Sequence, residues 1–189
     1  MATLCTGPVW ANHNQSGQRY AVDHLHPVIT RYEVPAVAAT RTKPGRAAMT
    51  VQVRITYSHH CFTQALEKMP DAKPDHYYNC TRRPGERRVF CVDRWNETLA
   101  LPTFIAELRT CYFTRHHNYF VWRSPTNPTL AEVFVYFRLD RRGAFVDLEV
   151  ESAYPRADAD DVRKGARKVS LITLIVNAAN GRRTHAPPR

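Results

Sequence analysis

The chain has 189 residues, of which 43% are hydrophobic, and its 27 basic and 17 acidic residues give a net charge of +10. This length supports one hydrophobic core rather than two, and the charge favours a polyanionic partner such as RNA or DNA. The longest apolar run, Leu171–Val176, is far below the ~20 residues that a membrane crossing requires. The N-terminus lacks the pattern of a secretory signal. We therefore expect a cytoplasmic protein with no membrane partner.

Residues 1–48 differ in composition from the rest of the chain. They contain Pro8, Pro27, Pro35 and Pro44 and few periodic apolar positions. This composition predicts a loosely ordered N-terminal arm, although a short strand within 21–34 that packs on the main domain stays open. We expect residues 49–178 to form a single globular domain and residues 179–189 to form an extended tail.

Apolar residues alternate with polar ones from Val51 to Tyr57, which predicts a half-buried strand. A proline-rich and charged stretch at 64–87 predicts a long excursion, and a short strand follows at 88–92. Pro102 suits a first helical position, and Leu101, Ile105 and Leu108 follow at helical spacing, so we expect a principal helix over about 101–111.

Further strands are expected after this helix, at 119–123, 132–139, 145–151 and 169–177, with a turn at 141–143. Runs of strands around one helix indicate an α+β fold. We expect a mainly antiparallel sheet of about five to six strands, with the helix packed on it.

The segment 112–123 mixes cations, imidazoles and large flat rings. Rings stack on unpaired bases and guanidinium groups hold phosphates, so this mixture predicts a surface that binds RNA or single-stranded nucleic acid. The opposing interpretation stays open: the rings fill the core and the arginines only solubilise the other face. The residues predicted to contact nucleic acid are Arg82, Arg83, Arg87, Arg88, Arg94, Arg115, Tyr119, Trp122 and Arg123.

Acid–base cleavage of RNA needs a proton acceptor, a proton donor and cations at the phosphate. His116 and His117 are the leading candidates for the catalytic groups, with Glu151 and Tyr154 as lesser ones. By strict alternation, Glu149 and Glu151 share one face of a strand, opposite Ser152. We expect no cofactor, because the usual nucleotide and metalloprotease motifs are absent from the sequence.

The five cysteines are an odd number and are widely spaced, which argues against a disulfide framework. Zinc accepts thiolate and imidazole ligands, and His60, Cys61, Cys91 and Cys111 are weak candidates for a site. No pair has the usual close spacing, so burial of these cysteines in the core is the favoured interpretation.

Four pieces from about Val51 onward are informative together: His60-Cys61-Phe62-Thr63, Arg87-Arg88-Val89-Phe90-Cys91, Leu101-Pro102 and Val150-Glu151-Ser152-Ala153-Tyr154. In these pieces the chain resembles uncharacterised small bacterial proteins that are associated with mobile elements. A second resemblance is to the barnase–EndoU–colicin–RelE ribonuclease superfamily, whose strand end is similar to Ser152-Ala153-Tyr154-Pro155. This resemblance implies a metal-independent, toxin-type endoribonuclease with Ser152 and Tyr154 in its pocket and an acidic antitoxin as partner. The alternative is a non-catalytic module that binds nucleic acid or acts as an adaptor for an acidic protein.

Overall fold

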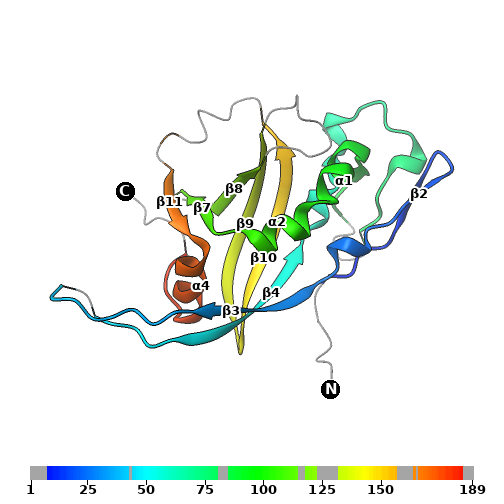
Figure 1. Cartoon of the computed structure of the whole chain (residues 1–189). Helices are drawn as coiled ribbons and strands as arrows, with labels where there is room; N and C mark the ends of the chain where they lie inside the picture. The colour runs from blue at the N-terminus through cyan, green and yellow to red at the C-terminus, as the bar shows by residue number, and fades with distance from the viewer. Residues whose placement is uncertain are drawn as a thin grey trace, which may run out of the picture.

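The computed structural model of the chain describes residues 8–42, 44–80, 85–114, 118–122, 132–156, 164 and 166–184, without the side chain of Trp122. Figure 1 shows a curved sheet with helices packed against it. The described elements, in chain order, are β1 (His13–Gln15), β2 (Gln18–Tyr20), η1 (Asp23–Leu25), β3 (Val28–Val34), β4 (Met49–Tyr57), η2 (His59–Cys61), β5 (Thr63–Ala65), η3 (Leu66–Lys68), η4 (Pro74–His76), β6 (Arg88–Phe90), α1 (Val92–Thr98), α2 (Leu101–Glu107), β7 (Thr110–Phe113), β8 (Asn118–Trp122), β9 (Val133–Arg142), β10 (Phe145–Pro155), β11 (Arg167–Ser170) and α4 (Leu171–Ala179).

The main sheet is mixed, and its described strands number seven, in the order β11-β7-β8-β9-β10-β4-β3. The strands β4 and β10 run parallel, whereas the other neighbours in this sheet run antiparallel. The α+β class is therefore confirmed, but the expected mainly antiparallel sheet of five to six strands is corrected to a mixed sheet of seven. The difference arises because β10 inserts between β9 and β4, so the hairpin of β3 and β4 joins the sheet through a parallel contact.

The two faces of the sheet have different chemistry. Along β9, Val135, Phe137 and Leu139 belong to the main core together with buried residues of α2 and α4. The alternate residues Phe134 and Tyr136 belong to a smaller aromatic cluster on the opposite face. Period-two alternation along the strand produces this division. We call the face that carries Tyr136 the second face.

The helices differ from the sequence prediction. Residues Leu101–Glu107 form α2. The expected helix over about 101–111 therefore ends earlier, and its last residues belong to the strand β7 (Thr110–Phe113). The strand expected at 169–177 is a short strand, β11, followed by helix α4, whose N-terminus is capped by the Ser170 side chain accepting from the backbone N–H of Thr173. Tertiary pairing of β7 with β11 overrides the local helical pattern.

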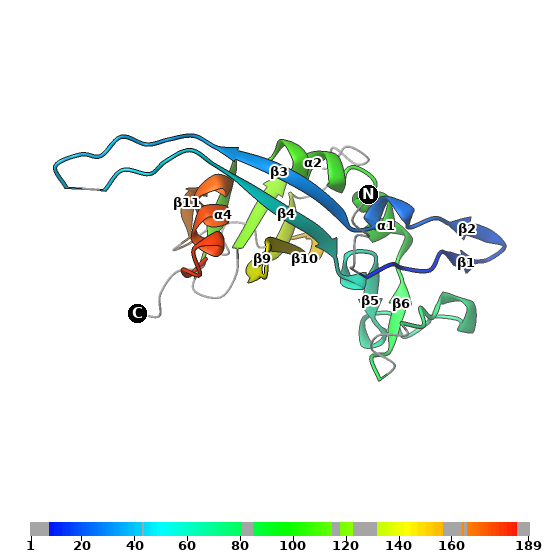
Figure 2. The same ribbon diagram turned by 90° about the horizontal axis from the view of Figure 1, so that it is seen from below.

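The described part of the expected N-terminal arm is largely integrated into the fold. Strand β3 pairs with β4 along its whole length, and Met49, expected to open the globular domain, is the first residue of β4. Val22 and Leu25 are fully buried, and Trp10 donates a hydrogen bond to the backbone oxygen of Tyr57. The loop between β3 and β4 projects from the body as a long extended arm (Figure 2).

The C-terminal segment also packs on the body where it is described. Helix α4 ends at Ala179, and the buried hydroxyl of Thr184 donates to the backbone oxygen of Leu139. None of the helices in the described part of the chain combines the length and the apolar character that a bilayer crossing demands.

Candidate functional site

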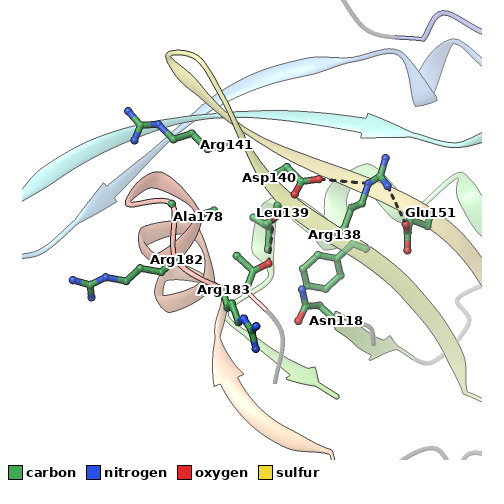
Figure 3. Close-up of a pocket in the computed structure, with 12 residues that line it drawn as sticks. Asn118, Arg138, Leu139, Asp140, Arg141, Glu151, Ala178, Arg182 and Arg183 are labelled. Atoms are coloured by element: carbon green, nitrogen blue, oxygen red, sulfur yellow. Dashed lines mark hydrogen bonds and ion pairs between the residues drawn. The ribbon is translucent and has the colours of Figure 1, made fainter. Parts of the chain in front are cut away.

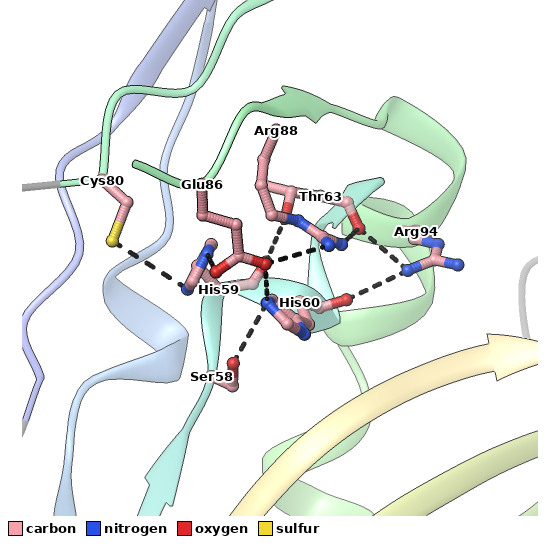
Figure 4. Close-up of polar contacts among 8 residues, drawn as sticks. All are labelled: Ser58, His59, His60, Thr63, Cys80, Glu86, Arg88 and Arg94. Carbon is pink, nitrogen blue, oxygen red and sulfur yellow. Dashed lines mark hydrogen bonds and ion pairs between the residues drawn. The ribbon is translucent and has the colours of Figure 1, made fainter. Parts of the chain in front are cut away.

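A polar cluster forms where η2, β5 and β6 meet, beside α1 (Figure 4). The Nε2 atom of His60 lies 2.6 Å from Oε1 of Glu86, and Nε2 of the buried His59 lies 3.5 Å from Oε2 of the same carboxylate. The guanidinium of Arg88 reaches Oε1 of Glu86 at 3.3 Å. We call these four residues the His60–Glu86 cluster.

Local structure fixes the two histidines. The side chain of Ser58 accepts from the backbone N–H of His60 and so caps the short helix η2. The hydroxyl of Thr63 donates to the backbone oxygen of His59 and accepts from Nε of Arg88. The Ser58 cap and the Thr63 hydrogen bonds together place both imidazoles against the Glu86 segment. The cluster is therefore rigidly positioned, although its partners are far apart in sequence.

The electrostatics of the cluster favour an ionised Glu86. Burial raises the pKa of this carboxyl, but the charges and hydrogen bonds of the neighbouring His60, His59 and Arg88 together lower it below its usual value. An ionised carboxylate beside an imidazole is a proton acceptor and donor pair within direct transfer distance.

His59, His60 and Glu86 also form the three-donor group that the described residues offer to a metal, with donor atoms within 4.8 Å of one another. Two imidazoles and a carboxylate fit zinc chemically. The guanidinium of Arg88 already lies beside the same carboxylate, and its positive charge opposes the binding of a dication there. The donor set therefore fits an acid–base and anion-binding role better than a metal centre.

Arg94, on α1, connects this cluster to the sheet. Its Nη1 atom donates to the backbone oxygens of Thr63, at 2.8 Å, and His60, at 3.1 Å. Its guanidinium carbon lies 5.1 Å from the ring centroid of Tyr154, near the end of β10. Within the described part of the chain, Arg94 forms no ion pair, and its Nε and Nη2 atoms have no hydrogen-bond partner.

The second face of the sheet supplies the other half of the site. The ring of Tyr154 stacks on that of Tyr136 at 5.7 Å, and the guanidinium of Arg156 lies 6.0 Å from the Tyr154 centroid while it donates to the Tyr136 hydroxyl. A pocket of about 300 Å³ is lined here by Thr114, Tyr119, Tyr136, Glu151, Ser152, Tyr154 and Arg156. We call Arg94, Ser152, Tyr154 and Arg156 the Tyr154 site.

A β-bulge sets the composition of this pocket. The register between β10 and β9 shifts between Val150 and Ser152, so Ser152 lies opposite Tyr136 whereas Glu149 lies opposite Arg138. Ser152 therefore shares the second face with Glu149, which corrects the expectation from strict alternation. The extra residue, Glu151, re-aims the strand end, as bulges beside functional sites commonly do.

A larger polar pocket of about 570 Å³ lies beside the C-terminal end of α4 (Figure 3). Its central cation, Arg138, is neutralised by Glu149 and approaches Asp140 and Glu151 at 3.7 and 3.8 Å. In Figure 3 the side chains of Arg141 and Arg182 extend away from Arg138. These arginines do not converge, so the pocket lacks the focused charge of an anion site.

The sequence-predicted site residues have different fates. Tyr154 and Glu151 line the Tyr154 site, Arg88 belongs to the His60–Glu86 cluster, and Arg94 joins the two. Arg87 is exposed. Tyr119 is fully buried, so it has no open face for stacking on a base. The following lie outside the described residues or, for Trp122, have an undescribed side chain: Arg82, Arg83, Arg115, His116, His117, Trp122 and Arg123.

The cysteines proposed as weak zinc ligands do not join the three-donor group. The thiols of Cys61, Cys91 and Cys111 are free and buried. Burial raises the pKa of Cys61 and that of Cys111 to about 12, which keeps both protonated at neutral pH. The structure therefore supports a role in core packing for these three cysteines.

Sequence reasoning missed Glu86 and Arg156. Glu86 lies in a charged excursion with no periodic pattern, 26 residues from His60, so no local signal marks it. Arg156 directly follows Tyr154-Pro155, and a cation beside an aromatic strand end was a signal available in the sequence.

Comparison with known proteins gives one finding. The model of the YjaZ family matches residues 12–179. No curated protein and no solved structure gives a match. Since the matched segment covers most of the 189 residues, the chain belongs to the YjaZ family.

Proposed function

We propose that this protein binds single-stranded nucleic acid, RNA in particular, at the Tyr154 site. The proposal depends on how the guanidinium of Arg94 is held. Two backbone carbonyls hold one of its nitrogens, and its Nε and Nη2 atoms make no hydrogen bond to a described residue. Nε and Nη2 form the planar fork that binds two phosphate oxygens at once, and the anchoring reduces the entropy cost of using it.

The neighbouring groups suit the rest of a nucleotide. Arg156 brings a second guanidinium to the same ring, and Ser152 and Thr114 add hydroxyls at the wall of the pocket. Guanidinium planes and aromatic rings stack on unpaired bases, which are exposed in single strands and hidden in duplexes. The net charge of +10 adds long-range attraction to a polyanion.

Fluorescence anisotropy with a labelled single-stranded RNA, repeated from low to moderate salt, tests the proposal. Contact with about five phosphates predicts a log–log slope of roughly −3.5. The double variant Arg94→Gln/Arg156→Gln should weaken binding at least tenfold, and thermal melting should show that it folds. Arg138→Gln/Arg19→Gln, which removes one arginine already neutralised by Glu149 and one exposed arginine of β2, has the same charge change and is the matched control. Absence of binding at low salt, or equal losses in variant and control, refutes the proposal.

A second candidate function is metal-independent cleavage of the bound RNA, favoured by the 2.6 Å contact between His60 and Glu86. Glu86 accepts the proton of a 2′-hydroxyl, the resulting oxygen attacks phosphorus, and the bond from phosphorus to the 5′-oxygen breaks. Protonated His60 donates its proton to that leaving oxygen. Arg94, which is not paired with a carboxylate of the described residues, neutralises the charge on the phosphorane.

This second candidate has its own assay. End-labelled RNA is incubated in EDTA with wild type, His60→Ala or Glu86→Gln, and the products are examined for 2′,3′-cyclic phosphate ends. Wild type should cleave and both variants should lose activity while still binding. If wild type binds RNA but leaves it as intact as the variants do, the protein is a binder without this activity. An acidic protein partner, expected from the sequence, should compete with RNA for the same face.

A further inference from the structure

A separate cavity lies on the helix-covered face of the sheet, and it shares no lining residue with the pocket at the Tyr154 site. Its volume is about 780 Å³, and its lining comes from β3, β4, α2 and the start of α4. This size falls within the about 300–1,000 Å³ typical of sites for small molecules. In Figure 1, α2 and α4 lie on the same side of the sheet near β3 and β4.

The walls of this cavity are mainly apolar. Val28, Tyr57, Pro102, Ala106, Leu108 and Ile172 supply much of the lining. Val28 is 51% exposed, which is unusual for a valine that lines a hollow in a sheet face. Exposed apolar surface that is concave and bordered by polar groups marks a ligand site more often than a flat surface does.

The walls are also fixed in place. The backbone N–H of Leu171, the first residue of α4, donates to the backbone oxygen of Arg109 at 2.9 Å. Strand β11, which leads into α4, pairs with β7, which follows α2. The two helices are therefore tied together at one end of the cavity, and its shape does not depend on ligand to bring them together.

Two of the polar groups in the lining concern ligand binding, the Tyr32 hydroxyl and the Arg109 guanidinium. The other polar residues of the lining are Thr30, Arg31, Glu33, Thr110 and Ser170. The hydroxyl of Tyr32 is buried and has no hydrogen-bond partner among the described residues. A buried hydroxyl that stays without a hydrogen bond destabilises the protein, and a ligand that accepts from it removes that cost. Arg109 is exposed, forms no ion pair within the described part of the chain, and makes only long contacts of 3.4 Å to two carbonyls. Burial raises the pKa of Tyr32, while the positive charge of Arg109 opposes that shift, so the two groups share one environment.

We propose that this cavity binds a small amphipathic carboxylate, with its carboxylate between Arg109 and the Tyr32 hydroxyl and its apolar body against Val28, Tyr57 and Ile172. A carboxylate satisfies the phenol O–H and neutralises the guanidinium together, which neither a hydrocarbon nor an alcohol does. This site is independent of nucleic-acid binding, since it uses none of the residues of the Tyr154 site.

Isothermal titration calorimetry with dodecanoate below its micelle concentration, compared with uncharged dodecanol, tests the proposal on the full chain. Wild type should bind dodecanoate at least tenfold more tightly than dodecanol. Arg109→Gln should lose that preference, and Ala106→Trp, which places a large ring from an exposed helix position into the cavity, should abolish binding. Arg19→Gln, an exposed arginine of β2 with the same charge change, is the control and should bind as wild type does.

Several results overturn the proposal. These are no uptake of dodecanoate by wild type, equal affinity for the acid and the alcohol, or undiminished binding by Ala106→Trp. An equal loss in Arg109→Gln and Arg19→Gln also overturns it, because that would indicate a general charge effect. If Ala106→Trp does not fold, the comparison of Arg109→Gln with Arg19→Gln still decides, since both positions are on the surface.

Discussion

Arginines from neighbouring segments lie against the two ends of strand β10, and they are held there in different ways. Near its start, Arg54 makes a two-pronged contact with Asp147, with N···O distances of 2.7 and 2.6 Å, and Arg138 pairs with Glu149. Near its end, Arg94 and Arg156 lie over the ring of Tyr154, and Arg94 is held by carbonyls instead of a carboxylate. The same residue type thus serves architecture at one end and remains attractive to an anion at the other.

This contrast explains why a count of basic residues is weak evidence for a binding site. A guanidinium that is already neutralised by a carboxylate gains little from a phosphate, because the phosphate must displace a partner of equal charge. A guanidinium fixed by neutral carbonyls keeps its full charge. Both ends have arginines, and they differ in whether a carboxylate or a neutral carbonyl group holds the guanidinium.

The largest expected effect is on stability at the paired end. Arg54→Leu leaves Asp147, whose side chain is only 17% exposed, with the more distant Arg142, at 3.9 Å, as its remaining ion-pair partner among the described residues. We expect the free energy of unfolding to fall by about 2–3 kcal/mol, as measured by urea denaturation, with RNA affinity unchanged. Arg138→Leu, at a half-exposed pair, should cost less than about 1 kcal/mol. Equal losses in the two variants would contradict the difference in burial.

The next effect is on binding at the Tyr154 end. Tyr154→Leu keeps an apolar side chain and removes the ring that Arg94 and Arg156 contact. We expect the binding free energy for single-stranded RNA to weaken by about 1–2 kcal/mol, because the cation–π contacts that position the two guanidinium groups are lost. Tyr77→Leu, which alters an exposed tyrosine, serves as the control. Anisotropy curves that coincide for the two variants would remove Tyr154 from the interface.

A finer test uses the salt dependence of binding. Arg94→Gln should reduce the magnitude of the log–log slope by about 0.7, the value for one phosphate contact on a single strand. Arg138→Gln should leave the slope unchanged because Glu149 already neutralises that arginine. The slopes come from anisotropy at five or more salt concentrations, and a drop in both variants would erase the distinction between the ends.

The smallest effect concerns acid stability of the His60–Glu86 cluster. Although burial raises the pKa of Glu86, its cationic neighbours lower it below the unfolded value in the folded protein. The resulting stabilisation is present above about pH 4.5 and disappears as the pH falls through the lower, folded pKa. We therefore expect Glu86→Gln to lower the free energy of unfolding by less than about 1 kcal/mol near pH 7. Between pH 7 and pH 3, the free energy of unfolding of this variant should decline less steeply than that of wild type.

Glu107→Gln, at an exposed position of α2, is the control for this pH series. Its curve should run parallel to that of wild type. A Glu86→Gln curve that also runs parallel would indicate that Glu86 is no better stabilised in the folded protein than in the unfolded chain.

Sequence patterns predicted the parts of the fold that depend on local periodicity. The alternation from Val51 to Tyr57 corresponds to β4, and Leu101 and Pro102 begin α2. Position in the sheet was beyond local patterns: nothing near Val146 indicates that it pairs with Val53. In the N-terminal segment, the alternative of a short strand within 21–34 agrees with β3, which pairs with β4. The sequence did not indicate that Val22 and Leu25 are buried, because tertiary contacts rather than a periodic stripe bury them.

Some residues of the candidate site could likewise be predicted from local sequence patterns, and others could not. Arg88 and Arg94 were candidates because of the mixture of rings and cations in the sequence, and Tyr154 was a candidate because of the polar end of its strand. The buried state of Tyr119 was not predictable, because either face of β8 suited the core until β9 contributed Phe134 and Tyr136 on that side. Glu86 was not predictable because its partnership with His60 arises from the fold of an irregular excursion.

The parallel pairing of β4 with β10 has a consequence for how the chain matures. Arg54 and Asp147, which face each other across it, are 93 residues apart, so the hairpin of β3 and β4 leaves the ribosome long before its neighbour is made. During that interval the inner edge of β4 has unsatisfied backbone groups and is open to pairing with other chains. Contacts of such long range slow folding. We expect chains truncated before β10 to aggregate, and the full-length protein to refold best when dilute.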